Sequence, residues 1–159
     1  MHSRIKVIVI LVIIMTLLGC QSQNNKLHKK TSTIKEEVSE NMNDTYIEMN
    51  SYLYEIELYD NQTSKELFKL FPLVLSMDDM NGNEKYCYMN KALPTLSQKV
   101  NEIKAGDVML FGDNCLVIFY KDFSTQYSYT KIGHIKDVNE FLKALPKGQV
   151  EVTFHNDET

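Results

Sequence analysis

Aromatic and polar side chains alternate in the stretch from residue 120 to residue 129, which is the best candidate for a ligand-binding surface. Tyr120, Phe123, Tyr127 and Tyr129 lie close in sequence to Gln126 and to several Ser and Thr residues. Such a set could line a groove that offers both apolar contact and hydrogen bonds. The alternative is that these rings only pack in the interior, and the sequence leaves both interpretations open.

Three carboxylates, Asp78, Asp79 and Glu84, flank the dipeptide Asn81-Gly82. Paired carboxylates can act as general acid and base. An Asn-Gly pair between two apolar segments is typical of a tight turn, however, and turns carry solvated acidic residues. We favour the solvated turn over an acid–base pair, and we predict no catalytic residues.

The histidines and cysteines show no pattern typical of metal binding or nucleophilic catalysis. No two of the four His residues have metal-ligand spacing, so we expect no metal and no cofactor. His134 is interpreted as a strand residue. Cys87 and Cys115 fall in apolar segments, where free buried thiols are common, and we favour two free thiols over a disulfide. Neither has a neighbouring His to activate it.

Hydrophobic periodicity predicts a β-rich domain from residue 46 to residue 155. Tyr52, Tyr54, Ile56 and Leu58 alternate with polar residues, as expected of a strand with one buried face. Nearly continuous apolar runs at 108–111 and 115–120 flank a Gly-Asp-Asn turn, which predicts a buried hairpin at the centre of the sheet. Further strands are predicted at 73–77, around residues 86–88, at 128–135 with Gly133 allowing a bend or close approach, and at 150–154.

Two short helices are predicted between the strands. The sequence Thr63-Ser64-Lys65-Glu66 resembles a capping box that opens a helix carrying residues 67–71, and Pro72 ends it. Asp137 is predicted to cap the second helix, whose apolar residues follow helical spacing as far as residue 145. Residues 91–101 are expected to form a loop. Many short strands with two helices favour a closed barrel capped at its ends.

The N-terminal residues 1–19 have the features of a signal peptide. A basic start with Arg4 and Lys6 precedes an apolar run of twelve residues, 7–18, interrupted only by a Thr. That run is shorter than the roughly 20 residues of a bilayer-spanning helix. The quartet Leu17-Leu18-Gly19-Cys20 resembles the lipobox of bacterial lipoproteins, which implies cleavage after Gly19 and a diacylglycerol on the Cys20 thiol. The alternative is a buried helix that happens to end in Cys.

Residues 20–45 are predicted to form a lipidated Cys and a flexible tether. This segment is rich in Gln, Asn, Lys, Ser, Thr and Glu up to residue 43, so it cannot bury enough apolar surface to fold alone. Two or three acyl chains would anchor the protein stably. We therefore expect the protein in the cell envelope, anchored by lipid to a membrane on its extracytoplasmic side. Residues 156–159 are expected to form a C-terminal tail.

The charge balance argues against a nucleic-acid partner. The whole chain has 17 basic and 21 acidic residues, a net charge of -4. Removing residues 1–19 takes away two of the basic residues, which leaves 15 against 21 and a net charge of -6. An acidic domain lacks the electrostatic attraction to phosphate on which nucleic-acid binding depends.

Several motifs in their order along the chain resemble small bacterial cyclophilin-like domains. They are LYDN at 58–61, LVLSM at 73–77, NGNEKY at 81–86, AGDVMLFG at 105–112, NCLVIFY at 114–120 and FSTQYSYT at 123–130. The resemblance covers residues 46–155. It implies a mainly β fold, a cyclophilin-like closed β-barrel of about eight strands capped by two short helices. It implies no particular reaction, because a fold does not fix a function.

The resemblance also suggests where a ligand would bind. By analogy with the proline-binding face of cyclophilins, Met77, Asn83, Glu84 and Lys85 would form the wall that faces the aromatic residues. True cyclophilins use an Arg guanidinium to stabilise the twisted prolyl amide. Arg4 is the only Arg of the chain, so the processed protein has none. A Lys is not an equivalent substitute for the planar guanidinium.

These observations favour a membrane-anchored, non-catalytic module that binds a peptide or a small ligand. The alternative is a weak peptidyl-prolyl isomerase that assists the folding of exported proteins. Measuring prolyl isomerisation on the soluble form, residues 21–159, would separate the two.

Overall fold

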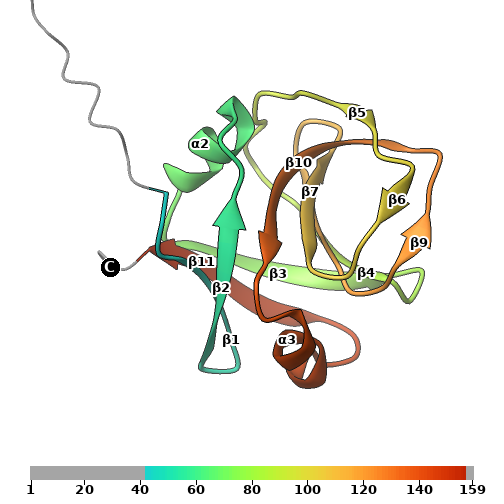
Figure 1. Cartoon of the computed structure of the whole chain (residues 1–159). Coiled ribbons are helices and arrows are strands. Elements are labelled where there is room, and N and C mark those ends of the chain that lie inside the picture. Colours follow the sequence, from blue (N-terminus) through green and yellow to red (C-terminus); the bar gives the residue numbers. More distant parts are fainter. Residues whose placement is uncertain (1–41, 157–159) are drawn as a thin grey trace, which may run out of the picture. The chain divides into compact units, whose positions relative to one another are not determined.

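The computed structural model of the chain describes residues 42–156 (Figure 1). The predicted signal peptide, Cys20, most of the predicted tether and residues 157–159 lie outside the described residues. The described elements are β1 (Thr45–Met49), β2 (Tyr52–Leu58), α2 (Gln62–Phe68), β3 (Leu73–Met80), β4 (Glu84–Tyr88), β5 (Gln98–Lys99), β6 (Glu102–Ile103), β7 (Asp107–Phe111), β8 (Cys115–Phe119), β9 (Phe123–Ser124), β10 (Ser128–Ile135), α3 (Val138–Ala144) and β11 (Val150–Asn156).

Eight antiparallel strands form a closed barrel, which confirms the predicted fold class. Their order around the wall is β2-β1-β11-β3-β4-β8-β7-β10, and pairing of β10 with β2 closes the ring. The helices α2 and α3 lie at opposite ends of the barrel (Figure 1). Among these eight strands, closure leaves no long sheet edge for another chain to pair with. The two-residue strand β5 extends the sheet beyond β10, and β6 pairs with β9 in a separate ribbon.

The predicted central hairpin is buried because both of its faces are covered. Along β8, Leu116 and Ile118 point into the barrel core. The alternate residues Cys115, Val117 and Phe119 point outward and form a second apolar cluster, with residues such as Ile103 of β6. This explains why the run is continuously apolar, whereas a strand with one solvated face alternates.

The barrel closes at Gly133 of β10. Gly133 pairs with Leu58 of β2 on one side and with Val108 of β7 on the other, and the register with β7 shifts just before it. A Cβ atom at this position would lie 2.6 Å from the backbone oxygen of Glu57. A side chain is therefore excluded by sterics, and the prediction of a close approach at Gly133 is confirmed.

The structure differs from the sequence-based expectation at the first helix. The cap of α2 is Asn61, whose side chain accepts a hydrogen bond from the Ser64 backbone N–H at 3.0 Å. Thr63 was predicted to open the helix, but it lies within the first turn and donates its hydroxyl to the Pro94 carbonyl at 2.6 Å. The helix also ends at Phe68, before the predicted residues 70 and 71.

Other differences are smaller. The strand β1 was not predicted as a separate element, and the predicted loop at 91–101 contains β5. Asp137 is the N-cap residue of α3, as predicted, but its side chain makes no capping hydrogen bond; only its backbone carbonyl accepts, from the N–H groups of Glu140 and Phe141. Phe141 is the buried anchor of α3, and its ring meets that of Tyr54 edge-on at 5.3 Å.

Candidate ligand-binding groove

A groove of about 520 Å³ lies on the outer face of the barrel, over β4, β7, β8 and β10. In Figure 1 this is the side of the barrel on which β6 and β9 lie. Its volume falls within the roughly 300–1,000 Å³ of ligand pockets. The groove is lined by Met80, Asn81, Asn83, Glu84, Tyr86, Tyr88, Phe111, Cys115, Val117, Phe123, Ser124, Thr125, Gln126, Tyr127 and Tyr129.

The alternation of strand residues positions one wall of the groove. In β4 the residues at spacing two, Glu84, Tyr86 and Tyr88, point to the outer face. β4 pairs with β8 so that Tyr86 lies opposite Val117 and Tyr88 opposite Cys115. The floor is therefore the apolar outer face of β8, and the second wall comes from residues 123–129.

Six aromatic rings surround this floor, and all but Phe123 contact another ring of the set. The rings of Tyr86 and Tyr88 meet edge-on at 6.0 Å. Phe111 is edge-on to Tyr127 at 6.0 Å and tilted to Tyr129 at 5.5 Å. Such contacts fix ring orientations at little entropic cost. Three of these rings, Tyr88, Phe111 and Tyr127, are nevertheless exposed, so the rim presents apolar surface to solvent.

The polar groups at one end of the groove have unmet hydrogen-bonding capacity. Glu84 is only 8% exposed, and no donor within residues 42–156 hydrogen-bonds to its carboxylate. Burial raises the pKa of Glu84. The Oδ1 atom of the adjacent Asn83 is buried and has no partner among the described residues. Burial, together with the charge of Glu84, raises the pKa of Tyr129 to about 12.

Six of the nine residues predicted for the groove line it. They are Asn83, Glu84, Phe123, Gln126, Tyr127 and Tyr129. The other three, Met77, Lys85 and Tyr120, do not. Met77 is fully buried in the barrel core, because in β3 it points the same way as Leu75. Lys85 follows Glu84 directly in a strand, so it points to the opposite face.

Lys85 instead forms buried contacts that connect three segments at one end of the barrel. It is 1% exposed, and its Nζ atom lies 2.9 Å from Asp79 Oδ2. The same ammonium donates to the carbonyls of Pro146, at 2.9 Å, and Gly148. These contacts connect β4 to β3 and to the segment between α3 and β11.

Asp79 is the hub of this cluster, and it lies in β3 rather than in the turn, with its side chain 29% exposed. Its Oδ1 atom accepts from the Tyr120 hydroxyl at 2.8 Å, and its Oδ2 atom accepts from the Gly148 backbone N–H. Burial acts to raise the pKa of Asp79, but the hydrogen bonds from Lys85, Tyr120 and Gly148 outweigh it and lower the pKa. Tyr120 is thus turned away from the groove by its bond to Asp79.

The two cysteines and His134 were not predicted for the groove, and of these three residues Cys115 lines it. Cys87 packs partly against the barrel core, whereas Cys115 lies in the outer cluster, so the two free thiols point to opposite faces of the wall. Burial raises the pKa of both thiols. His134 lies in β10, as predicted, and its Nδ1 atom is 2.9 Å from Asp107 Oδ1. Within residues 42–156 no cluster of three potential metal ligands was found.

Sequence reasoning missed several residues of the groove. Tyr86 and Tyr88 were assigned to one strand face, and their spacing of two from Glu84 is the signal that places all three together. Phe111 and Cys115 flank the turn of the central hairpin. Nothing in the sequence pattern there indicates whether their side chains line the groove or pack in the core.

A family model described as the cyclophilin-like family matches residues 47–155. This chain belongs to the cyclophilin-like family. The match spans the barrel from β1 to β11, and it agrees with the motifs from which the resemblance was drawn. A comparison with curated proteins finds no match. The matched cyclophilin-like region contains no Arg. Among residues 42–156, no helix is long and apolar enough to cross a bilayer.

Proposed function

We propose that the cyclophilin-like domain is a non-catalytic module that binds a peptide or a small ligand in the aromatic groove. The observation that carries this proposal is the groove itself, where six aromatic rings and several polar groups converge on one hollow. Exposed aromatic rings around a concave surface are typical of binding sites. The matched region has no guanidinium to donate to a prolyl nitrogen, which argues against efficient prolyl isomerisation.

The binding proposal predicts that Tyr127 contributes and that an equally exposed tyrosine elsewhere does not. Tyr127 is 64% exposed at the groove rim, and Tyr52 is 66% exposed on β2. Titrating residues 21–159 with pentapeptides of the form Ac-Ala-Ala-X-Ala-Ala-NH2, where X is Leu, Phe, Lys or Pro, is expected to shift NMR signals of the groove. Tyr127→Ala should weaken the tightest of these complexes about tenfold, as expected for an aromatic contact worth about 1.5 kcal/mol. Tyr52→Ala should leave it unchanged.

The same peptides distinguish binding from catalysis. With the X = Pro peptide we expect no acceleration of cis–trans exchange above the spontaneous rate. Robust acceleration that Tyr127→Ala abolishes would favour the isomerase alternative. Failure of every peptide to shift the groove signals would contradict the binding proposal.

We further propose that Cys20 carries the lipid that holds the domain at the extracytoplasmic side of a membrane. The proposal is supported by the basic start, the short apolar run and the quartet at 17–20. Mass spectrometry of the membrane-extracted protein should find an N-terminal Cys20 with the mass of attached acyl chains. Cys20→Ser should prevent processing at Gly19, whereas Cys87→Ser should not. An unmodified Cys20 in the mature protein would refute the anchor.

A further inference from the structure

Glu84 is only 8% exposed, and its carboxylate faces the groove without a counter-ion among the described residues. No Lys or His of residues 42–156 lines the groove, and the neighbouring Lys85 points to the other face, where Asp79 engages it. A desolvated carboxylate is unfavourable unless a cation or hydrogen-bond donors compensate it. Glu84 is therefore a group that a bound ligand could satisfy.

A second acceptor lies beside it. The buried Asn83 Oδ1 atom lacks a donor within the described part of the chain, and Asn83 and Glu84 both line the groove where β4 begins. Two neighbouring acceptors without a donor favour a ligand that brings several N–H donors. An ammonium group has three donors and a positive charge, which suits one carboxylate and one amide oxygen.

The aromatic walls favour the same kind of ligand. Ring faces attract cations, and the attraction grows when the cation is desolvated. Tyr86 and Tyr129, like Glu84, line the groove, and burial as well as Glu84 keep Tyr129 protonated. The rings and the carboxylate thus create a hollow of negative potential with apolar walls.

We propose that the groove binds a peptide through a lysine side chain, whose ammonium lies against Glu84 and Asn83; this inference rests on the proposed binding function. A peptide suits the site better than a free amine. The groove extends beyond the Glu84 end, and the exposed Tyr88 and Tyr127 at its rim would contact residues that flank the lysine.

The test compares three probes on residues 21–159 by NMR titration: Ac-Ala-Ala-Lys-Ala-Ala-NH2, the same peptide with norleucine in place of lysine, and n-butylammonium. We expect the lysine peptide to bind at least tenfold more tightly than either of the other two. Equal affinity for lysine and norleucine would overturn the cation inference while leaving the binding function intact. Equal affinity of the lysine peptide and n-butylammonium would contradict the inference that the ligand is a peptide rather than a free amine. If no probe binds, the proposed function itself fails.

Glu84→Gln is the decisive variant, with Glu57→Gln as its control. Both remove one negative charge, but Glu57 is exposed on β2 and does not line the groove. Glu84→Gln should weaken the lysine peptide about tenfold and change the norleucine peptide less than twofold. Glu57→Gln should change neither. Equal losses in both variants would mean that only long-range charge matters, and would contradict the assignment of Glu84.

The affinity for the lysine peptide at low pH provides a further test, because a merely structural role of Glu84 would not make this affinity depend on its charge. Within the described part of the chain, Glu84 interacts electrostatically with Cys115, Tyr120 and Tyr129, all of which stay neutral in acid. Asp79, which accepts from Tyr120, is kept ionised by Lys85. Burial raises the pKa of Glu84, whereas that of Asp79 is lowered, so Glu84 loses its charge at a higher pH than Asp79 does. The lysine peptide should weaken over that range with the wild-type protein but not with Glu84→Gln.

Discussion

Replacing Lys85 with methionine is expected to lower the free energy of unfolding by about 3 kcal/mol, because the substitution removes the ion pair with Asp79 and leaves two backbone carbonyls without their donor. Methionine nearly fills the volume but offers no donor to Asp79 or to the carbonyls of Pro146 and Gly148. The value is set at the low end of the range for buried pairs, since the Asp79 side chain is 29% exposed and water can reach it. Thermal unfolding should show a midpoint lowered by about 10 °C.

The control is Lys136→Met. Lys136 also pairs with a carboxylate, that of Glu55, but both side chains are well exposed. Exposed pairs contribute little, so the loss should be less than about 1 kcal/mol. Equal losses in the two variants would contradict the view that burial makes the Lys85 cluster important.

The pH dependence of stability offers a second measurement on the same variant. The pKa of Asp79 is lowered in the folded state, so its contribution to stability is present above its unfolded pKa and is lost as the pH falls through the folded one. With Lys85 gone, the main donor that lowers this pKa is absent. The acid-induced loss of stability below about pH 4 should therefore be shallower in Lys85→Met than in the wild type.

Gly133→Ala is the second substitution with a large expected effect, a loss of about 3 kcal/mol from overpacking. The added Cβ atom would lie 2.6 Å from the Glu57 carbonyl oxygen. That oxygen belongs to backbone and cannot move aside as a flexible side chain would. The strands β2 and β10 must separate, and this pairing is the one that closes the barrel.

Lys131→Ala serves as the comparison, because Lys131 is an exposed residue of the same strand. It should change the free energy of unfolding by no more than about 0.5 kcal/mol. Hydrogen exchange should localise the damage: the Tyr59 amide, which donates to the Ile132 carbonyl at 2.8 Å, should exchange faster in Gly133→Ala. An unchanged exchange rate of the Tyr59 amide, together with an unchanged free energy of unfolding, would show that β2 and β10 accommodate the extra methyl group.

The barrel was predictable because strand periodicity is a strong local signal. The continuous apolar run of β8 indicated correctly that both of its faces are covered. The alternation in β2 predicted its buried face correctly from Tyr54 onward, but Tyr52, predicted on that same face, is 66% exposed at the start of the strand. The strands β5, β6 and β9 were not predicted, because two-residue strands owe their existence to distant partners. The α2 cap was misplaced by two residues because Asn61, Thr63 and Ser64 can each act as a cap.

The groove was predictable in part for the same reason. Glu84 and Lys85 were assigned to one wall by analogy, although consecutive strand residues must point to opposite faces. The period-two rule alone predicts that Glu84 and Tyr86, and not Lys85, lie on the same wall of the groove. The direction of Tyr120 could not be predicted, because it depends on a hydrogen bond to Asp79, a residue 41 positions away in sequence.

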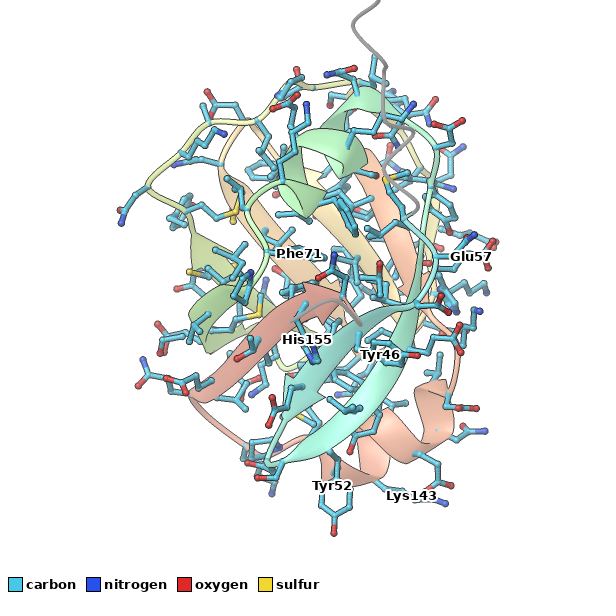
Figure 2. All side chains as sticks on the ribbon, turned by 90° about the vertical axis from the view of Figure 1, so that its left-hand side faces the viewer. Tyr46, Tyr52, Glu57, Phe71, Lys143 and His155 are labelled. Carbon is cyan, nitrogen blue, oxygen red and sulfur yellow. The ribbon has the colours of Figure 1, made fainter. Side chains whose placement is uncertain are left out.

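The order of the strands has a practical consequence for anyone who wishes to attach this domain to a surface. Thr45 and Asn156 are register partners on β1 and β11, the wall diametrically across the ring from β8 and β7. Figure 2 looks onto that wall, where Tyr46 of β1 and His155 of β11 lie next to each other. A sensor chip, fluorophore or fusion partner joined at Thr45 or Asn156 would therefore lie on the wall opposite the aromatic groove, and immobilisation there should leave the groove accessible to analytes.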